Sequence, residues 1–376
     1  MFDVAVVGIG AMGAMAAWSA ASRGASVVGF EQYGIAHDRG SSHGGSRIFR
    51  RTMFEGEHYN PIVARAADLW QKLETESGTQ LLQPSGGLCI GPRDGELIVD
   101  ALRCAAAGGV EHELLEPDEL AARFPQHAHI PGDVGVFEPG AGVLKPEAAI
   151  TAAAELAAKA GAQLRTECTV TAIRCEDAMV TIETPDETVT ARRAIIATGA
   201  WFTDLLPELA LPLGIQRSSL MWFTGADRAA YRPDRFPVFI RESGPVDGWG
   251  IPDADGRGVK LGAGPTAPKP WIDHPRDNDH PVDEKDVEPV AEFCRAAFPG
   301  LDPRPLDARA CMNSKTPDGD FVLGIPEAAP RLVLAGGFSG HGFKHASAVG
   351  EIVADLALAG GSPIPLERFS PDRFRS

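Results

Sequence analysis

The opening stretch MFDVAVVGIGAMGAMAAWSAASRGASVVGFE (residues 1–31) decides the fold of this protein. DVAVV at residues 3–7 predicts a buried parallel strand, and GIGAMG at residues 8–13 predicts a glycine turn. An alanine-rich helix follows and ends at Gly24, after which a second strand ends on Glu31. A strand, a glycine turn, a helix and a strand with a terminal acid are typical of a Rossmann unit.

Each glycine of this motif has its own predicted role. Gly8 makes the tight turn, Gly10 lets backbone amides approach a pyrophosphate, and Gly13 lets the helix pack closely on the strand. Glu31 lies 18 residues after Gly13 and can accept hydrogen bonds from ribose hydroxyls. We therefore predict that the unit binds a dinucleotide, while the motif leaves open which dinucleotide it is.

Further pieces of the same sheet lie far away in the chain. Residues 190–201 predict a strand that runs into ATG, and residues 331–360 predict a strand, a glycine turn and a helix. Two insertions, at about 80–143 and 215–310, carry short segments typical of antiparallel strands. The later turns supply further predicted cofactor contacts: Gly199, Gly340, His341 and Gly342.

The length of the chain supports two domains. Its 376 residues exceed the roughly 250 to 300 residues at which a single core stops growing. We expect an α/β protein with a discontinuous Rossmann-type cofactor domain and a substrate domain with a largely antiparallel β-sheet. The predicted boundaries are 1–80, 144–214 and 311–376 for the cofactor domain, and 81–143 and 215–310 for the substrate domain.

The charge of the chain limits its partners. With 35 Lys and Arg against 51 Asp and Glu, the formal net charge is -16. Nucleic acid and anionic membranes both require a basic face, so we expect a small ligand instead. A strand that begins at residue 2 leaves no room for a signal peptide, and no apolar run approaches the roughly 20 residues of a membrane helix. These features predict a cytoplasmic protein.

The segment after the second strand breaks the regular Rossmann pattern. It is polar and glycine-rich and carries His43, Arg47, Arg50 and Arg51 close together. Such a loop suits a second, flat, electron-rich ring system near basic groups. A solvated basic loop is the alternative that these residues alone leave open.

The six cysteines show neither CxxC nor Cys/His ligand spacing, so neither a disulfide framework nor a zinc site is indicated. Five of them are interpreted as small hydrophobic residues. Cys311 differs, because it lies in the polar stretch RACMNSKTPDGD (residues 309–320), which we predict to be a turn. A cysteine in a turn has no core to fill.

Several blocks of the sequence together resemble the monomeric sarcosine oxidase and N-methyltryptophan oxidase family of FAD-dependent amine oxidases. The resemblance runs nearly end to end through VVGIGAMG, GSSHGGSRIFR, FEPGAGVL, IIATGAW, GVKLG, ACMNSKTPDGDF and GGFSGHGFKHASAVGE. It implies FAD as the cofactor, an amino acid as the substrate, oxygen as the acceptor, hydrogen peroxide as a product and a monomeric protein. It implies no metal.

The resemblance also gives Cys311 a role. In this family the cysteine of a CxxxxTPD block forms a thioether with the 8α-methyl group of FAD, and Cys311 with the TPD sequence at residues 316–318 occupies that place. Covalent attachment of FAD through Cys311 is therefore implied. Arg309 and Lys315 are nearby cations that we expect to lower the pKa of the thiol.

Other functional residues follow from the same resemblance. His43 and Arg47 match the histidine and arginine that lie against the flavin. Arg50 and Lys344 match the pair that binds the substrate carboxylate, for which arginine offers bidentate geometry. Lys260 matches the lysine that promotes the reaction of reduced flavin with oxygen, where a buried cation would stabilise the developing superoxide.

The substrate pocket departs from the sarcosine oxidase pattern. Gly264 stands where a histidine is expected, Asn313 where a tyrosine is expected, and Met53 where an aromatic residue is expected. Trp249 replaces a pocket tyrosine and Ile240 a methionine, so the predicted pocket stays partly apolar. A bulkier N-alkyl or cyclic secondary amino acid is at least as plausible a substrate as sarcosine.

Three alternatives remain at this point. A flavin dehydrogenase would pass electrons to a carrier, which Lys260 disfavours. A flavin-binding protein without turnover is disfavoured by the retained Arg50, Lys344 and Lys260. A nicotinamide-dependent dehydrogenase rests on the first 31 residues and leaves the block around Cys311 unexplained.

Overall fold

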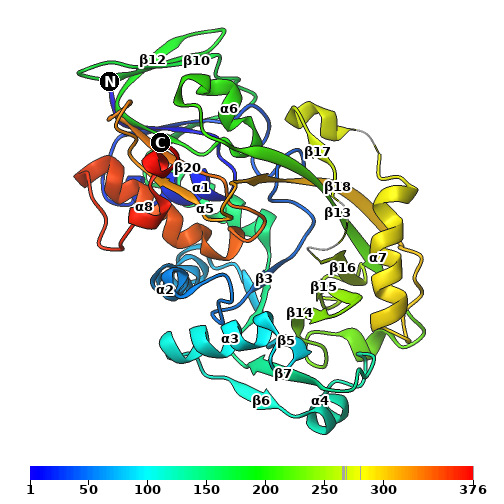
Figure 1. Ribbon diagram of the computed structural model, residues 1–376. Helices are drawn as coiled ribbons and strands as arrows, with labels where there is room; N and C mark the ends of the chain where they lie inside the picture. Colours follow the sequence, from blue (N-terminus) through cyan, green and yellow to red (C-terminus); the bar gives the residue numbers. More distant parts are fainter. Residues whose placement is uncertain (265–266, 268, 280, 376) are drawn as a thin grey trace.

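The computed structural model of the protein describes residues 1–264, 267, 269–279 and 281–375. Two large β-sheets form its framework, and the long strands β13 and β18 run between the two halves of the molecule (Figure 1). Helices α1, α5 and α8 lie beside the first sheet, and α7 lies on the outer side of the second (Figure 1).

The first sheet has eight strands and contains the Rossmann unit. Parallel pairing joins β9, β2, β1, β12 and β20 in that order, while β10, β11 and β19 pair antiparallel at its margins. The inner strands are almost wholly buried, as expected for a parallel sheet. The strands are β1 (Phe2–Val7), β2 (Val27–Phe30), β9 (Gln163–Arg165), β10 (Ala172–Cys175), β11 (Val180–Glu183), β12 (Thr188–Ile196), β19 (Val322–Gly324) and β20 (Leu332–Gly336).

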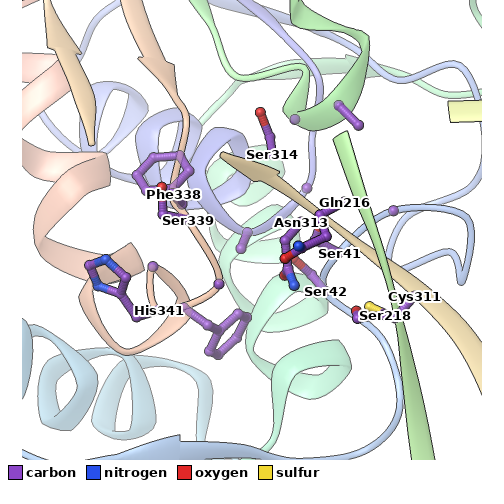
Figure 2. A pocket seen from close by; sticks show the side chains of 18 of the residues that line it. Ser41, Ser42, Gln216, Ser218, Cys311, Asn313, Ser314, Phe338, Ser339 and His341 are labelled. Atoms are coloured by element: carbon purple, nitrogen blue, oxygen red, sulfur yellow. The ribbon is translucent and has the colours of Figure 1, made fainter. Parts of the chain in front are cut away.

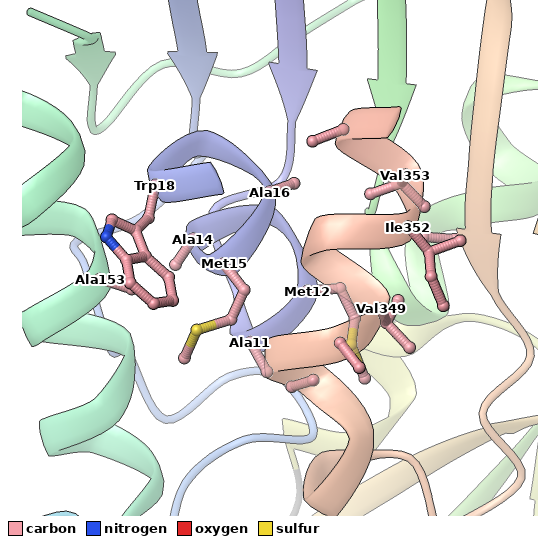
Figure 3. Packing of buried hydrophobic residues seen from close by; sticks show 14 of the residues in the cluster. Ala11, Met12, Ala14, Met15, Ala16, Trp18, Ala153, Val349, Ile352 and Val353 are labelled. Atoms are coloured by element: carbon pink, nitrogen blue, oxygen red, sulfur yellow. The ribbon is translucent and has the colours of Figure 1, made fainter. Parts of the chain in front are cut away.

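Helix α1 (Ala11–Ala21) is buried along its whole length except at Ser19. It packs between α5 (Pro146–Lys159) and α8 (Ala346–Ala359), as Figure 3 shows. The contact with α8 depends on Gly350, where a Cβ atom would lie 2.4 Å from Cβ of Met15. Small residues therefore let the two helices approach closely enough to place the glycine turn of α1 at the sheet edge. Helix α2 (Asn60–Ser77) packs against α5 and α8.

The second sheet has nine strands, in the order β17, β13, β16, β15, β14, β5, β7 and β6, with β18 also paired to β13. Its pairs are antiparallel except for β14 with β5. The strands are β5 (Gly87–Pro92), β6 (Glu113–Leu115), β7 (Asp133–Glu138), β13 (Gly214–Phe223), β14 (Val238–Ser243), β15 (Val246–Ile251), β16 (Val259–Ala263), β17 (Trp271–Ile272) and β18 (Asp307–Lys315).

Shorter elements complete the molecule. A three-stranded sheet joins β3 (Arg47–Phe49), β8 (Gly142–Leu144) and β4 (Leu82–Pro84). The remaining helices are α3 (Glu96–Ala107), α4 (Pro117–Arg123), α6 (Phe202–Leu205) and α7 (Glu284–Ala297). The 3-10 turns are η1 (Glu57–Tyr59), η2 (Gly199–Trp201), η3 (Pro207–Leu209), η4 (Arg228–Tyr231), η5 (Pro275–Asp279), η6 (Phe343–His345), η7 (Glu367–Phe369) and η8 (Pro371–Phe374).

The prediction that Cys311 lies in a turn is wrong. Residues Asp307–Lys315 form β18, which pairs with β13 along its whole length, and Cys311 lies opposite Ser218. The stretch is polar because Asn313 and Lys315, on the same face of the strand as Cys311, border a cavity and not a hydrophobic core. The strand also crosses residue 311, where the predicted domain boundary falls.

Within the described residues, no helix is both long and apolar enough to cross a bilayer. The same residues contain no cluster of three His, Cys, Asp or Glu side chains with the geometry of a metal site.

Candidate active site

A cavity of about 760 Å³ lies where the two large sheets meet. Its walls include the end of β1 with its glycine turn, the segment that follows β12, the faces of β13 and β18, and the loop before α8 (Figure 2). The volume falls in the range of cofactor and ligand sites. Residues from all the separated pieces of the predicted cofactor domain therefore border one space.

The glycine turn at the end of β1 has the geometry that a pyrophosphate requires. Gly8 has φ +87°, and a Cβ atom there would lie 2.6 Å from the carbonyl oxygen of Ala197. A Cβ atom on Gly13 would lie 1.8 Å from the carbonyl oxygen of Gly8, so Gly13 packs the helix on the turn. Gly10 lines the cavity, and no atom lies within 4 Å of the Cβ position at Gly10.

Glu31 also lines the cavity, at the end of β2. Its carboxylate accepts hydrogen bonds from the backbone amides of Ile9, at 2.9 Å, and Tyr33, at 3.0 Å. It thus holds the glycine turn against the second strand. Two buried hydroxyl groups on the cavity wall, Oγ1 of Thr198 and Oγ of Ser314, have no hydrogen-bond partner in the described part of the chain. These features fit a dinucleotide with its hydroxyl and phosphate groups.

Gly199, Gly340, His341 and Gly342 all border the same cavity. Gly199 and Gly340 have positive φ angles of 57° and 90°, so each makes a turn that favours glycine. His341 is mostly buried, and burial lowers its pKa to about 4 despite the nearby negative charge of Glu55. A neutral imidazole at this position donates or accepts a hydrogen bond without adding charge.

Cys311 is 4% exposed and lines the cavity beside Ser218 (Figure 2). Burial raises the pKa of its thiol, but a hydrogen bond to His43 and the positive charges of His43 and Arg47 outweigh burial and bring the pKa to about 7. The predicted cause, the charges of Arg309 and Lys315, is wrong, because Arg309 is paired with Asp307 at 3.2 Å on the surface. A thiol with this pKa is largely ionised near pH 8.

Of the residues predicted to act beside the flavin, one lines the cavity and the others are buried behind its wall. Arg47 borders the cavity and donates hydrogen bonds to the carbonyl oxygens of Ser41 and Ser46, both at 2.7 Å. His43 is 4% exposed and lies behind the cavity wall, with Nε2 unpartnered among the described residues. Its hydrogen bond to the thiol of Cys311, which lines the cavity, links it to this space.

Lys260 is buried behind the same wall, on β16. Its Nζ donates hydrogen bonds to the carbonyl oxygens of Gly44, at 2.9 Å, and Ser46, at 2.6 Å. Burial and, secondarily, the positive charge of Arg47 hold the pKa of Lys260 well below its usual range. Lys260 thereby ties the turn before β3 to the second sheet.

Arg50 and Lys344 come from distant parts of the chain and converge on Glu55. Glu55 was not predicted from the sequence as a site residue. Oε1 of Glu55 lies 2.6 Å from Nη2 of Arg50 and 3.2 Å from Nζ of Lys344. All three side chains line the cavity. Burial raises the pKa of Glu55, but the charges of Arg50 and Lys344 hold it well below its usual range. The site therefore places two cations around one carboxylate.

Some of the predicted substrate-binding residues also line the cavity, whereas one is buried behind its wall. Ile240 and Trp249 border the cavity as opposed residues on β14 and β15. Met53 is fully buried behind Arg50, with its sulfur 3.9 Å from Nη1 of that residue. Met53 therefore supports the guanidinium and does not form part of the cavity wall, whereas Phe54 does, with its ring centroid 4.0 Å from the Arg50 guanidinium carbon.

The fold and cavity define a dinucleotide-binding enzyme in which a Rossmann sheet and a second sheet share one site. The chain belongs to the family of FAD dependent oxidoreductases, which matches residues 3–356. The predictions of the fold class, of FAD as the cofactor and of an FAD-dependent enzyme are confirmed by this match.

Two named relatives show which members of this family the chain is similar to. The chain is 37% identical to a monomeric sarcosine oxidase from Streptomyces avermitilis, over 99% of this chain and 98% of that protein. It is 33% identical to an N-methyl-L-tryptophan oxidase from Escherichia coli O157:H7, over the full length of both. The resemblance to this family is thereby confirmed.

Solved structures show the same fold. NikD, described as an unusual amino acid oxidase essential for nikkomycin biosynthesis, superposes with a TM-score of 0.86 at 24% identity, covering 98% of this chain and 97% of NikD. L-proline dehydrogenase from P. horikoshii superposes with a TM-score of 0.85 at 24% identity, covering 99% and 97%. These likenesses establish the architecture.

Proposed function

We propose that this protein is an FAD-dependent oxidase of a secondary amino acid, with an N-alkyl or cyclic amine. The observation that carries the proposal is the convergence of Arg50 and Lys344 on one carboxylate inside the cavity. A substrate carboxylate has the same charge and shape as the carboxylate of Glu55, so it can replace Glu55 between the two cations. The names of the sarcosine and N-methyltryptophan oxidases support a substrate of this class.

Gly8, Gly10 and Gly13 with Glu31 would hold FAD, which would supply the hydride-accepting chemistry at the carbon next to the amine nitrogen and the reduction of oxygen to hydrogen peroxide. The side chains of the protein position the substrate and place charges around it. Arg50 and Lys344 fix the carboxylate, while Ile240 and Trp249 border the bound amino acid and exclude water. Arg47 places a positive charge on the cavity wall, and Lys260 supplies the buried amine that assists the oxygen reaction.

We further propose that FAD is attached covalently through Cys311. The thiol pKa of about 7 supports this, because the thiolate is the reactive form. The test is acid denaturation of purified protein, followed by a denaturing gel viewed for flavin fluorescence. Fluorescence should stay with the wild-type chain and be lost in Cys311→Ala. Cys89→Ala is the matched control, since burial raises the pKa of that buried thiol to about 12 and it should keep the flavin.

We also propose that the protein has the predicted domain boundaries, is a monomer and is located in the cytoplasm. The net charge of -16 supports a protein that binds neither nucleic acid nor membrane. Several relatives are named as monomeric, which supports a monomer.

The activity is tested by adding N-alkyl and cyclic amino acids to the yellow protein. Bleaching of the flavin without air, followed by oxygen consumption and peroxide release in air, is the expected result. Bleaching without rapid reoxidation by oxygen would favour a dehydrogenase that passes electrons to a carrier. Absence of bleaching with every secondary amino acid would contradict the proposal and favour a flavin-binding protein without turnover.

A further inference from the structure

Part of the cavity wall is a sheet surface built by β14, β15 and β16. Ile240 lies opposite Trp249, and Glu242 lies opposite Asp247, on β14 and β15. Because side chains alternate along a strand, these four residues share one face, and all four line the cavity. We call this surface the cavity floor, with an apolar row (Ile240 and Trp249) and an acidic row (Glu242 and Asp247).

The opposite face of these strands packs in the core. A Cβ atom on Gly248 would lie 2.5 Å from the ring of Phe293, a residue of α7. Phe239 and Arg241 are 1% exposed on the same side. The alternation is therefore fixed by burial, and the acidic row cannot turn away from the cavity without exposing this core.

Two glycines on the neighbouring strand and just beyond it make room for the floor. A Cβ atom on Gly262 would lie 2.3 Å from the indole of Trp249, and a Cβ atom on Gly264 would lie 1.8 Å from Oδ1 of Asp247. The indole and the carboxylate therefore lie across positions 262 and 264, where any larger residue would displace them. Gly264 is the position where the family pattern has a histidine, so this chain replaces an imidazole with a carboxylate from the adjacent strand.

The acidic row lies at the end of the floor that is farther from Lys260. Lys260 pairs with Ile251, Gly262 with Trp249, and each row is two residues further along the strands. At about 3.4 Å per residue, the acidic row is about 14 Å along the strands from the row of Lys260. The aromatic face of Trp249 lies between the two.

Charged side chains of both signs border this end of the cavity. Glu242 forms no ion pair within the described residues, and burial followed by the negative charge of Asp247 raises its pKa. Lys269 and Lys315 also line the cavity, and burial followed by the positive charge of Lys315 lowers the pKa of Lys269, which the negative charge of Asp247 partly offsets. A cationic group that entered here would meet two carboxylates and an indole face.

We propose that the cavity floor selects amino acids that carry a second, cationic group, an ammonium or a guanidinium, at the end of the side chain. The inference rests on the proposed function, in which Arg50 and Lys344 hold the carboxylate of the substrate. The side chain then runs along the apolar row, and its cation reaches Glu242 and Asp247 through charge-assisted hydrogen bonds and contact with the indole. Cations for the carboxylate and carboxylates for the side-chain cation together discriminate against amino acids with neutral side chains.

The test compares Nα-methyl-L-lysine with Nα-methyl-L-norleucine, which lacks only the ammonium group. Affinity is measured without air from the change in flavin absorbance, and kcat/KM from peroxide release. The wild-type holoenzyme should prefer the lysine compound by about tenfold in both. Glu242→Gln and Asp247→Asn should each reduce this preference severalfold.

Glu96→Gln is the matched control. The negative charge of Glu96 also raises the pKa of Glu242, but Glu96 does not line the cavity. The preference for the lysine compound should therefore persist in this variant. Oxidation of both compounds at equal efficiency, or a preference that survives both floor variants, would overturn the inference and leave the proposed function standing. Tighter binding of the lysine compound without oxidation of either would contradict the proposed function and support the cationic selectivity.

Discussion

Oε1 of Glu55 lies 2.6 Å from Nη2 of Arg50, so the chain supplies its own carboxylate to the guanidinium that we assign to the substrate. Lys344 contacts the same oxygen. Oε2 of Glu55 is buried without a hydrogen-bond partner in the described chain. A substrate must therefore displace a charged side chain that is well paired on one oxygen only.

Glu55→Gln should tighten substrate binding, because it removes a competitor for Arg50 and Lys344. We expect KM to fall by about tenfold and Tm to fall as well, since two buried cations lose their partner. Initial rates and thermal unfolding of the holoenzyme check both. The control is Glu57→Gln, an exposed acid 3.3 Å from Arg103, which should change neither. A raised KM in Glu55→Gln would show that Glu55 assists binding instead.

The thiol of Cys311 should titrate near neutrality. Its alkylation by iodoacetamide, in protein produced without FAD, should rise as the pH passes about 7 and level off above pH 8. His43→Ala or Arg47→Gln should move the midpoint upward, because each removes a group that favours the thiolate. Mass spectrometry of the peptide that contains Cys311 gives the rates. An unchanged midpoint in both variants would contradict this origin of the low pKa.

Carboxylate binding should weaken above pH 8. Burial lowers the pKa of Lys344 to about 8, despite the partly offsetting charge of Glu55, so the amine is protonated below this pH and neutral above it. The Kd of acetate, which has no amine of its own, should rise by about tenfold between pH 7 and pH 9. In Lys344→Met the Kd should be higher and should lose this pH dependence. The Kd is obtained at each pH from the change in flavin absorbance as acetate is added.

Gly350→Ala should destabilise the cofactor domain. The added Cβ atom would lie 2.4 Å from Cβ of Met15 and 2.5 Å from its backbone carbon, and helix backbone cannot yield cheaply. We expect a loss of about 1–3 kcal/mol in the free energy of unfolding. Gly361→Ala is the control, because no atom lies within 4 Å of its Cβ position. Equal Tm values for the two variants would contradict the packing argument.

The local parts of the fold were predictable from the sequence. Buried strands, a glycine turn and an alanine-rich helix follow from residues that are neighbours in the chain, and Gly8, Gly10 and Gly13 take the predicted positions. The antiparallel segments of the insertions were also recognisable from their alternation. The one local error concerns β18, where a polar strand that borders a cavity has the composition of a turn.

The site was only partly predictable, because its electrostatics depend on groups that are distant in sequence. Arg309 and Lys315 are the nearest cations to Cys311 along the chain, yet His43 and Arg47 lower its pKa, since β13 and β18 bring the thiol to the loop before β3. Glu55 follows Arg50 by five residues, but nothing in its surroundings distinguishes it from a surface acid until Lys344 arrives from the other end of the chain.

The sequence by itself determined the dinucleotide unit, the cofactor family and the cationic residues of the site, because short motifs encode backbone conformations that do not depend on the rest of the chain. Only the tertiary structure decided which of these side chains reach the cavity and which stand behind its wall, and that Glu242 and Asp247 share its floor. Strand register, burial and long-range Coulomb forces exist only after distant segments have packed together.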